Sequence, residues 1–457
     1  MPHPFDIAII GGGASGVLTA IQCLRQATTP LRIALFEPGP RLAEGVAYAT
    51  HRPEHLLNVN SARMSALPDR PDDFLHWLCT QPGHLQAAQA ALAHGYAPRR
   101  DYADYLRQRL AQAQADSPAR LEVVPRRIER LTRDPGGWVL AGGGARVHAR
   151  HVLLATGNTP RPLPASGAAT LPAQCLVEAW DHAAVAAIDP GQRVCIIGTG
   201  LSMADALLTL AGNRHRGGIH LLSRHALLPL PHTPVHAVDE QLPVDCLHAM
   251  PLRARLRALR QGMRNAAARG LPWQAVMERL RPHGQALWRS LPVAEQRRFL
   301  RHAQRHWDIH RHRVAPTVHA LLQDQRNDGH LHLHRARLDT VTATLDGVCL
   351  NAHARDGHTL ELTVDRIINA TGLELRAAAM RSPLLAGLLD AGHVQPGAHG
   401  LGLASDADGR LIDTHGHAQD DLRTIGSLRI GEAWESIAVP ELRGQADAVA
   451  RAWTRTA

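Results

Sequence analysis

A glycine pattern near the start of the chain offers the clearest chemistry in the sequence. Gly11, Gly13 and Gly16 follow the spacing Gly-x-Gly-x-x-Gly, between a short apolar run and a stretch with helical spacing. In such a turn the first glycine permits a tight bend, the second lets the backbone approach a pyrophosphate, and the third lets the helix pack close to the strand. The amide hydrogens of Ala14 and Ser15, at the start of the helix, then point towards the phosphates. The pattern therefore predicts a dinucleotide-binding turn.

An acidic residue follows at the spacing that this kind of site requires. Glu37 comes about twenty residues after the last glycine, where a carboxylate can accept hydrogen bonds from a ribose hydroxyl. Hydrophobic periodicity predicts a strand over 7–10, a helix over 14–26 and a second strand over 31–36. A glycine-rich turn without a ligand is the alternative, and the agreement of strands, helix and acid argues against it.

A second, weaker copy of the pattern lies near the middle of the chain. A predicted strand over 194–197 leads into Gly198 and Gly200, and Ser202 lies at the start of the following helix. Met203 stands at the third glycine position, so close packing of helix and strand is less secure here. Gly198, Gly200 and Ser202 are the candidate contacts for a second nucleotide.

The next predicted strand, 218–222, leads to Ser223 and Arg224. At this position an NAD site carries an acid, whereas an arginine suits a 2′-phosphate. The sequence therefore favours NADPH over NADH, and a solvated surface arginine is the alternative interpretation of Arg224.

Two strand ends share the sequence Ala-Thr-Gly. The first is Ala155-Thr156-Gly157, after a predicted strand over 151–155, and the second occupies 370–372. Because the two glycine motifs and the two Ala-Thr-Gly strand ends are interleaved, we expect one nucleotide-binding domain inserted in another.

The predicted fold is α/β, with two Rossmann-like doubly wound nucleotide-binding domains. The first is discontinuous and covers 1–165 and 373–457, and the second covers 166–372. Helical apolar spacing without strand alternation predicts an α-helical insertion over about 230–327 in the second domain.

Two further groups of residues are candidate ligand contacts. Asn60 lies in a polar turn segment, where its side chain could contact a cofactor or could equally form the turn. His310, Arg311 and Arg313, in the insertion, are candidate substrate contacts, with structural packing and surface charge as the alternative. The histidines of this segment are not accompanied by further residues at the spacing of metal ligands, so no metal site is predicted.

Composition excludes several classes of protein. The 457-residue chain carries a net charge of +9 and contains no lysine, which excludes Schiff-base chemistry and a P-loop lysine. Its six cysteines form no Cys-x-x-Cys pair, which argues against a disulfide framework, a zinc knuckle and a dithiol redox centre. The arginines are dispersed, which argues against a nucleic-acid partner. No apolar stretch is long enough to cross a bilayer, so we expect a cytoplasmic protein; the oligomeric state stays open.

These motifs together resemble those of the two-dinucleotide-binding-domain flavoproteins. The chain is similar to a bacterial family of FAD/NAD(P)-binding oxidoreductases and, more distantly, to the flavin-dependent N-hydroxylating monooxygenases. The resemblance rests on segments that span nearly the whole chain: IIGGGASG, LLNVNSARMSALP, LLATGNTP, IIGTGLSMAD, RFLRHAQRHWDIHRHR, IINATG and WESIAVPELR.

The resemblance implies the course of FAD along the first domain. The turn 11–16 would hold its pyrophosphate and Glu37 its ribose, Val124 would sit by the adenine, and 155–157 would line its path. Gly426 and a loop that begins at Trp434 would approach the flavin, with a helix starting at Pro440 aimed at the pyrimidine edge of the ring.

The predicted function is that of an FAD-dependent oxidoreductase, specifically a monooxygenase in which NADPH is the reductant and the substrate is a small molecule. One alternative is a flavin dehydrogenase or oxidase that its substrate reduces directly. The other is a non-catalytic flavin-binding redox sensor or scaffold.

Overall fold

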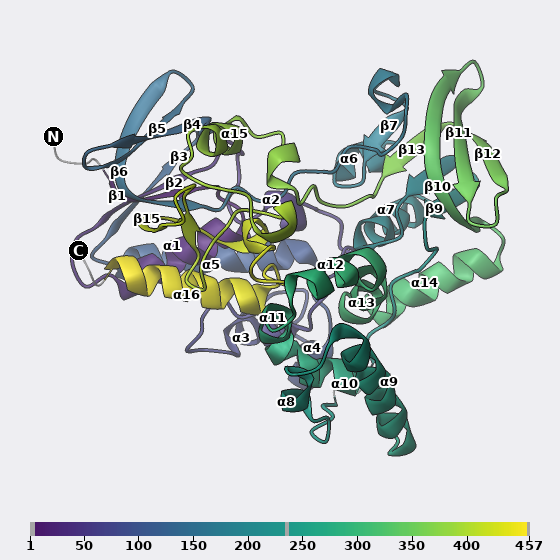
Figure 1. Ribbon diagram of the computed structural model, residues 1–457, viewed down its shortest axis with the longest axis horizontal. Helices are drawn as coiled ribbons and strands as arrows, with labels where there is room; N and C mark the ends of the chain where they lie inside the picture. The colour runs from purple at the N-terminus through teal and green to yellow at the C-terminus, as the bar shows by residue number, and fades with distance from the viewer. Residues whose placement is uncertain (1–4, 234–236, 455–457) are drawn as a thin grey trace. The chain divides into compact units, whose positions relative to one another are not determined.

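The computed structural model describes residues 5–233 and 237–454 (Figure 1). Residues 1–4, from the stretch before the predicted first strand, lie outside this description. The chain folds into two compact units: Met1–Pro53, Val59–Thr159 and Glu374–Ala457 form the first, and Glu54–Asn58 with Pro160–Leu373 form the second. The sequence pattern predicts a second domain over 166–372, whereas the second unit of the structure covers Pro160–Leu373 and also the segment Glu54–Asn58.

The first unit is built on a mostly parallel sheet with the strand order β14-β15-β6-β1-β2-β3. Strands β15, β6, β1, β2 and β3 pair in parallel, as expected for buried apolar runs joined by crossovers. An antiparallel extension β4-β5 continues from β6, and β14 pairs antiparallel with β15. The strands are β1 (Phe5–Ile10), β2 (Arg32–Phe36), β3 (Arg120–Val124), β4 (Arg130–Asp134), β5 (Gly137–Gly142), β6 (Ala145–Leu154), β14 (Arg410–Ile412) and β15 (Ala418–Thr424).

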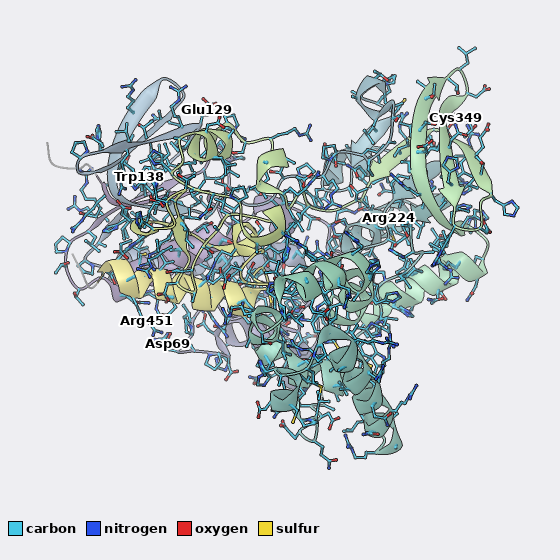
Figure 2. The ribbon with its side chains drawn as sticks, viewed as in Figure 1. Asp69, Glu129, Trp138, Arg224, Cys349 and Arg451 are labelled. Atoms are coloured by element: carbon cyan, nitrogen blue, oxygen red, sulfur yellow. The ribbon has the colours of Figure 1, made fainter. Side chains whose placement is uncertain are left out.

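Helices α1 (Ala14–Gln26), α5 (Arg99–Asp116) and α16 (Val439–Thr454) pack together in this unit, and Figure 1 shows the yellow α16 beside α1. A cluster of buried apolar side chains in the same unit includes Trp138, which is fully buried and labelled in Figure 2. The predicted helix 14–26 is confirmed at both ends. The other α-helices of the unit are α2 (Gly45–Tyr48), α3 (Asp73–Cys79), α4 (Gln89–His94) and α15 (Pro383–Asp390).

The second unit has a sheet with the strand order β12-β11-β10-β9-β8-β13-β7. Strands β10, β9, β8, β13 and β7 are parallel, and β10, β11 and β12 form an antiparallel extension. The sequence analysis missed β7, a three-residue strand after a proline-rich crossing, which is too short for a periodic signal. The strands are β7 (Leu176–Glu178), β8 (Val194–Ile197), β9 (Ile219–Ser223), β10 (Leu331–Thr344), β11 (Gly347–Ala354), β12 (Thr359–Val364) and β13 (Arg366–Asn369). The α/β class with two doubly wound domains is therefore confirmed.

The helical insertion is also present, although its first helix begins at Val244 rather than near 230. Part of it packs around its own apolar core, which includes Leu242, Val276 and Met277. The helices of the second unit are α6 (His182–Ala186), α7 (Leu201–Gly212), α8 (Val244–Leu247), α9 (Leu252–Ala268), α10 (Trp273–Leu280), α11 (Gly284–Arg289), α12 (Val293–His302), α13 (Gln304–Arg311) and α14 (Pro316–Asn327). Among the residues that the structure describes, no helix has the length and apolar character to span a membrane.

A buried arginine ties the helices of the insertion together. Arg255, which is 6% exposed, donates from Nε to the carbonyl of Met250 at 2.8 Å and from Nη1 to that of Leu287 at 2.6 Å. Its Nη2 donates to the His248 carbonyl and to Ser290 Oγ, both at 3.0 Å. One side chain thus satisfies two carbonyls that follow α8 and one in the last turn of α11.

Replacing Arg255 by alanine is expected to destabilise the protein by about 3 kcal/mol, because four part-buried hydrogen bonds from a charged donor are lost at once. Denaturant unfolding followed by far-ultraviolet circular dichroism measures this change. Arg253→Ala, on the exposed face of the same helix, is the matched control and should change stability by less than about 0.5 kcal/mol. Equal effects of the two substitutions would contradict a structural role for Arg255.

Three histidines stack on the second sheet. His220 on β9 lies in register with His332 on β10, and their ring centroids are 5.1 Å apart. His220 Nδ1 lies 3.0 Å from Nε2 of His334, a hydrogen-bond distance that requires one of the two nitrogens to be unprotonated. Burial, and then the nearby His334 and His332, lower the pKa of His220 from 6.5 to about 4.

The protein is expected to lose stability as the pH falls from 6.5 to about 4. In this window the unfolded chain binds protons that the folded His220 excludes, so protonation favours unfolding. Melting temperatures measured across this pH range check the prediction. His220→Gln, which cannot take up a proton, should show a shallower fall; parallel curves for the two proteins would assign the pH dependence to other groups.

Candidate functional site

The first glycine turn leaves no room for larger residues. Gly11 has a φ of +112°, and a Cβ at this position would lie 2.2 Å from the carbonyl oxygen of Ala155. A Cβ on Gly16 would lie 1.9 Å from the Gly11 carbonyl oxygen, so α1 can pack this close to β1 only with glycine there. Gly13 caps α1 without a side-chain hydrogen bond, which leaves the first-turn amides available to a phosphate.

The Glu37 carboxylate lies directly beside this turn. Its Oε2 accepts from the Gly12 amide and its Oε1 from the Gly39 amide, both at 2.8 Å. Each carboxylate oxygen keeps further lone-pair capacity for a ribose hydroxyl. The Glu37 amide donates to the Val124 carbonyl at 3.1 Å, so the structure brings Val124 and Glu37 together at the ends of neighbouring strands.

Residues from the C-terminal segment meet the other side of the turn. A Cβ on Gly426 would lie 3.3 Å from Ser15 Oγ, and Ser427 Oγ donates to the Gly157 carbonyl at 3.2 Å. The corner 155–157, the start of α1 and Gly426 are thus brought together, and their contact with FAD stays a prediction.

Two polar residues that the sequence analysis missed hold the loop before α16. Ser436 Oγ donates to the Gly426 carbonyl at 2.7 Å, and Gln445 Nε2 donates to the Ser436 carbonyl at 2.8 Å. Gln445 Oε1 in turn accepts from the Gly426 amide at 3.0 Å. The buried Trp434 lies within this braced loop. Helix α16 begins at Val439, one residue before the predicted start at Pro440.

Asn60 has an unusual environment. It precedes the short 3₁₀ helix Ser61–Arg63 but its side chain does not cap that helix. Its Oδ1 is buried and has no hydrogen-bond partner among the described residues, and the same holds for Oδ1 of Asn158. An unpaired buried acceptor costs about 1–3 kcal/mol, so these amides fit a bound group with donors better than a turn-forming role.

The second glycine turn repeats the geometry of the first. Gly198 has a φ of +109°, and a Cβ there would lie 2.2 Å from the Ala370 carbonyl oxygen. Gly11 is equally close to the carbonyl of the first Ala-Thr-Gly corner. Gly200 caps α7 without a side-chain hydrogen bond. Met203, at the third glycine position, is fully buried, and Ser202 Oγ accepts from Trp180 Nε1 at 3.0 Å.

Arg224 is exposed immediately after β9, and Figure 2 labels it. Its position at the end of the strand next to β8 is the one that the sequence pattern predicted. The sequence analysis missed Arg305, on α13, which donates from Nη2 to the Thr199 carbonyl at 2.7 Å, inside the second glycine turn.

The three predicted substrate contacts lie in different environments. Arg313 is 4% exposed, forms an ion pair with Glu278, and places its guanidinium 5.8 Å from the centre of the Trp273 ring. Arg311 is also buried. His310 lies edge-on to Trp273 at 5.0 Å, and its Nδ1 is 2.7 Å from the carbonyl oxygen of His306. The ion pair with Glu278 and the contact with Trp273 thus explain the burial of Arg313. A substrate contact at His310 stays a prediction.

No group of three or more histidine, cysteine or carboxylate side chains in residues 5–233 and 237–454 is arranged to hold a metal ion.

One protein-family model matches the N-terminal part of the chain. Residues 8–159 match the FAD-NAD(P)-binding family model. This part of the chain is an FAD/NAD(P)-binding domain and contains the first glycine turn, Glu37, Asn60 and Val124. No curated protein sequence matches the chain.

Solved structures with the same fold span the whole chain. A reduced form of the ornithine hydroxylase PvdA from Pseudomonas aeruginosa superposes with a TM-score of 0.65 at 17% identity, covering 99% of both chains. The ornithine N-hydroxylase KtzI from Kutzneria sp. 744 gives a TM-score of 0.69 at 15% identity over 100% of both. The bacillithiol disulfide reductase Bdr from Bacillus cereus gives 0.57 at 14% identity over 99% of both. At these identities the likeness shows the fold alone.

Proposed function

We propose that this protein is an NADPH-dependent flavin monooxygenase that acts on a small amine-bearing molecule. The observation that carries the proposal is the repetition of one geometry: Gly11 and Gly198 each follow a parallel strand and press against the carbonyl of an Ala-Thr-Gly corner. One chain thus has a turn for FAD and a second turn for a nicotinamide dinucleotide. A bound FAD supplies the electron transfer and the oxygen chemistry, so no side chain has to act as a nucleophile.

In this proposal the residues of the first unit bind and orient FAD. The amides at the start of α1 hold the pyrophosphate, Glu37 accepts from the ribose, and Val124 lies by the adenine. Asn60 offers its unpaired carbonyl oxygen to a donor of the bound group. Gly426, the loop 434–439 and the positive end of α16 face the flavin, where a helix N-terminus stabilises negative charge on the ring.

The substrate class is proposed from the solved structures of the same fold. Their titles name ornithine for two hydroxylases, lysine for a monooxygenase from Pseudomonas syringae, and cadaverine for DfoA from Erwinia amylovora. Small primary amines are therefore the first substrates to test on this chain.

Disulfide reductases share the fold, but the cysteines here do not support their chemistry. All six cysteines are free, and burial raises the pKa of both Cys23 and Cys195 to about 12. A thiol with so high a pKa is almost entirely protonated at neutral pH, and the thiolate is the reactive form. The protonation of these two thiols, together with the lack of a Cys-x-x-Cys pair in the sequence, favours a monooxygenase over a dithiol reductase.

Anaerobic mixing with NADPH tests the proposal. The flavin absorbance of the purified protein should be lost within seconds on addition of NADPH, and on admission of air an amine substrate should be hydroxylated. Reduction by the substrate alone, with NADPH inert, would contradict the proposal and support a dehydrogenase or oxidase. Absence of turnover with every donor and acceptor would support a redox sensor or scaffold.

A further inference from the structure

The helical insertion reaches the second glycine turn through one side chain. Arg305, on α13, donates from Nη2 to the carbonyls of Thr199 and Leu227, both at 2.7 Å. Thr199 lies between the two glycines of the turn, and Leu227 lies in the segment that follows β9. A single guanidinium therefore joins the insertion to both parts of the nucleotide-binding edge.

The positive charge of Arg305 is not needed for these contacts. Both carbonyl acceptors are neutral, and in the part of the chain that the structure describes no carboxylate forms an ion pair with Arg305. Nε and Nη1 of the same guanidinium have no hydrogen-bond partner among those residues. Burial lowers the pKa of Arg305, and the charge of Asp308 opposes this only in part. Neither nitrogen is among the fully buried unpaired atoms of the described residues, so both are accessible to an anion, which would form charge-assisted hydrogen bonds with them.

Other cationic side chains surround the same strand end. Arg224 and His225 follow β9, and Arg335 on β10 lies in register with Ser223, the last residue of β9. His306 follows Arg305 on α13. Burial, followed by the positive charges of Arg224, His306, Arg335 and Arg305, lowers the pKa of His225, which places all five groups in one electrostatic neighbourhood.

We propose that Arg305 is a binding residue for the pyrophosphate of the nicotinamide dinucleotide, and that Arg224 and Arg335 at the rim receive its 2′-phosphate. The inference rests on the proposed use of NADPH. In the second turn Met203 stands where a third glycine would allow close packing of α7. Arg305, which lies outside the motif, adds a positive charge that the glycine pattern does not supply.

Titration calorimetry of the FAD-loaded protein with NADP⁺ and with NAD⁺ tests this assignment. Arg305→Gln keeps a donor but removes the charge, and should weaken both nucleotides about ten- to hundredfold, as expected for a charged hydrogen bond. Arg335→Gln should weaken NADP⁺ but leave NAD⁺ unchanged, because only NADP⁺ carries the 2′-phosphate. Arg301→Gln, on the exposed part of α12, is the matched control and should bind both nucleotides as the wild type does.

The melting temperature without nucleotide and the bound FAD are measured on the same samples. In Arg305→Gln the bound FAD should be unchanged, whereas the melting temperature should fall, because the shorter glutamine side chain cannot keep both hydrogen bonds to the Thr199 and Leu227 carbonyls. Wild-type affinity for NADP⁺ in this variant would overturn the inference alone, leaving the proposed function in place. A loss of stability without any loss of affinity would make Arg305 purely structural and would also overturn it. Failure of the wild type itself to bind either nucleotide would overturn the inference together with the NADPH step of the proposed function.

Discussion

Replacing Gly16 by alanine is expected to yield protein that lacks bound FAD. The added Cβ would lie 1.9 Å from the carbonyl oxygen of Gly11 and 3.3 Å from Cγ2 of Ile9. Because the first of these is backbone at the tight turn, α1 must move away from β1 and carry its first-turn amides with it. The loss of two hydrogen bonds to a charged phosphate, at about 1.5–3 kcal/mol each, weakens binding at least about a hundredfold. The ratio of flavin to protein absorbance in the purified sample measures the loss.

Gly444→Ala is the matched control for this experiment. Gly444 lies within α16 of the same unit, and a Cβ there would meet no atom within 4 Å. Alanine favours a helix over glycine by about 0.5–1 kcal/mol, so this variant should keep its FAD and melt slightly higher than the wild type. A fully flavin-loaded Gly16→Ala protein would contradict the assignment of the first turn to the pyrophosphate.

The parts of the structure that the sequence predicted are those specified by local chemistry. Residues 14–26 combine a glycine turn with helical spacing, and the structure has α1 at those bounds. The four-residue strand β8 is likewise placed as predicted, because its apolar run stops at the glycine turn. In both cases neighbouring residues in the chain determine the conformation, so the pattern is sufficient.

The parts that the sequence analysis missed depend on residues far apart in the chain. His55 lies in the segment 54–58, which belongs to the second unit, and its side chain is buried. Its Nε2 lies 3.1 Å from the Asp205 carbonyl and 2.9 Å from Thr209 Oγ1. Arg305 meets Thr199 across 106 positions of the chain. No periodicity in the sequence marks such pairs, since each is set by how the helices pack.

The buried pair Arg313 and Glu278 leads to the second large effect. Replacing Arg313 by alanine is expected to destabilise the protein by about 3–5 kcal/mol, because the mostly buried carboxylate of Glu278 would lose its ion pair with Arg313. The guanidinium also packs against Trp273, so its removal opens space in the insertion. Urea unfolding monitored by tryptophan fluorescence measures the change.

A variant with both charges removed separates pairing from substrate contact. If Arg313 is structural, Arg313→Met with Glu278→Leu should recover most of the stability lost in Arg313→Ala, since apolar groups of similar size often replace a buried ion pair at little cost. The same double variant should then retain its KM for the substrate. A raised KM in a double variant of native stability would instead return Arg313 to the role of a substrate contact.

His310→Ala completes the comparison. His310 lies at the edge of the Trp273 ring, outside the ion pair. If His310 touches the substrate, this variant should have a raised KM at native stability.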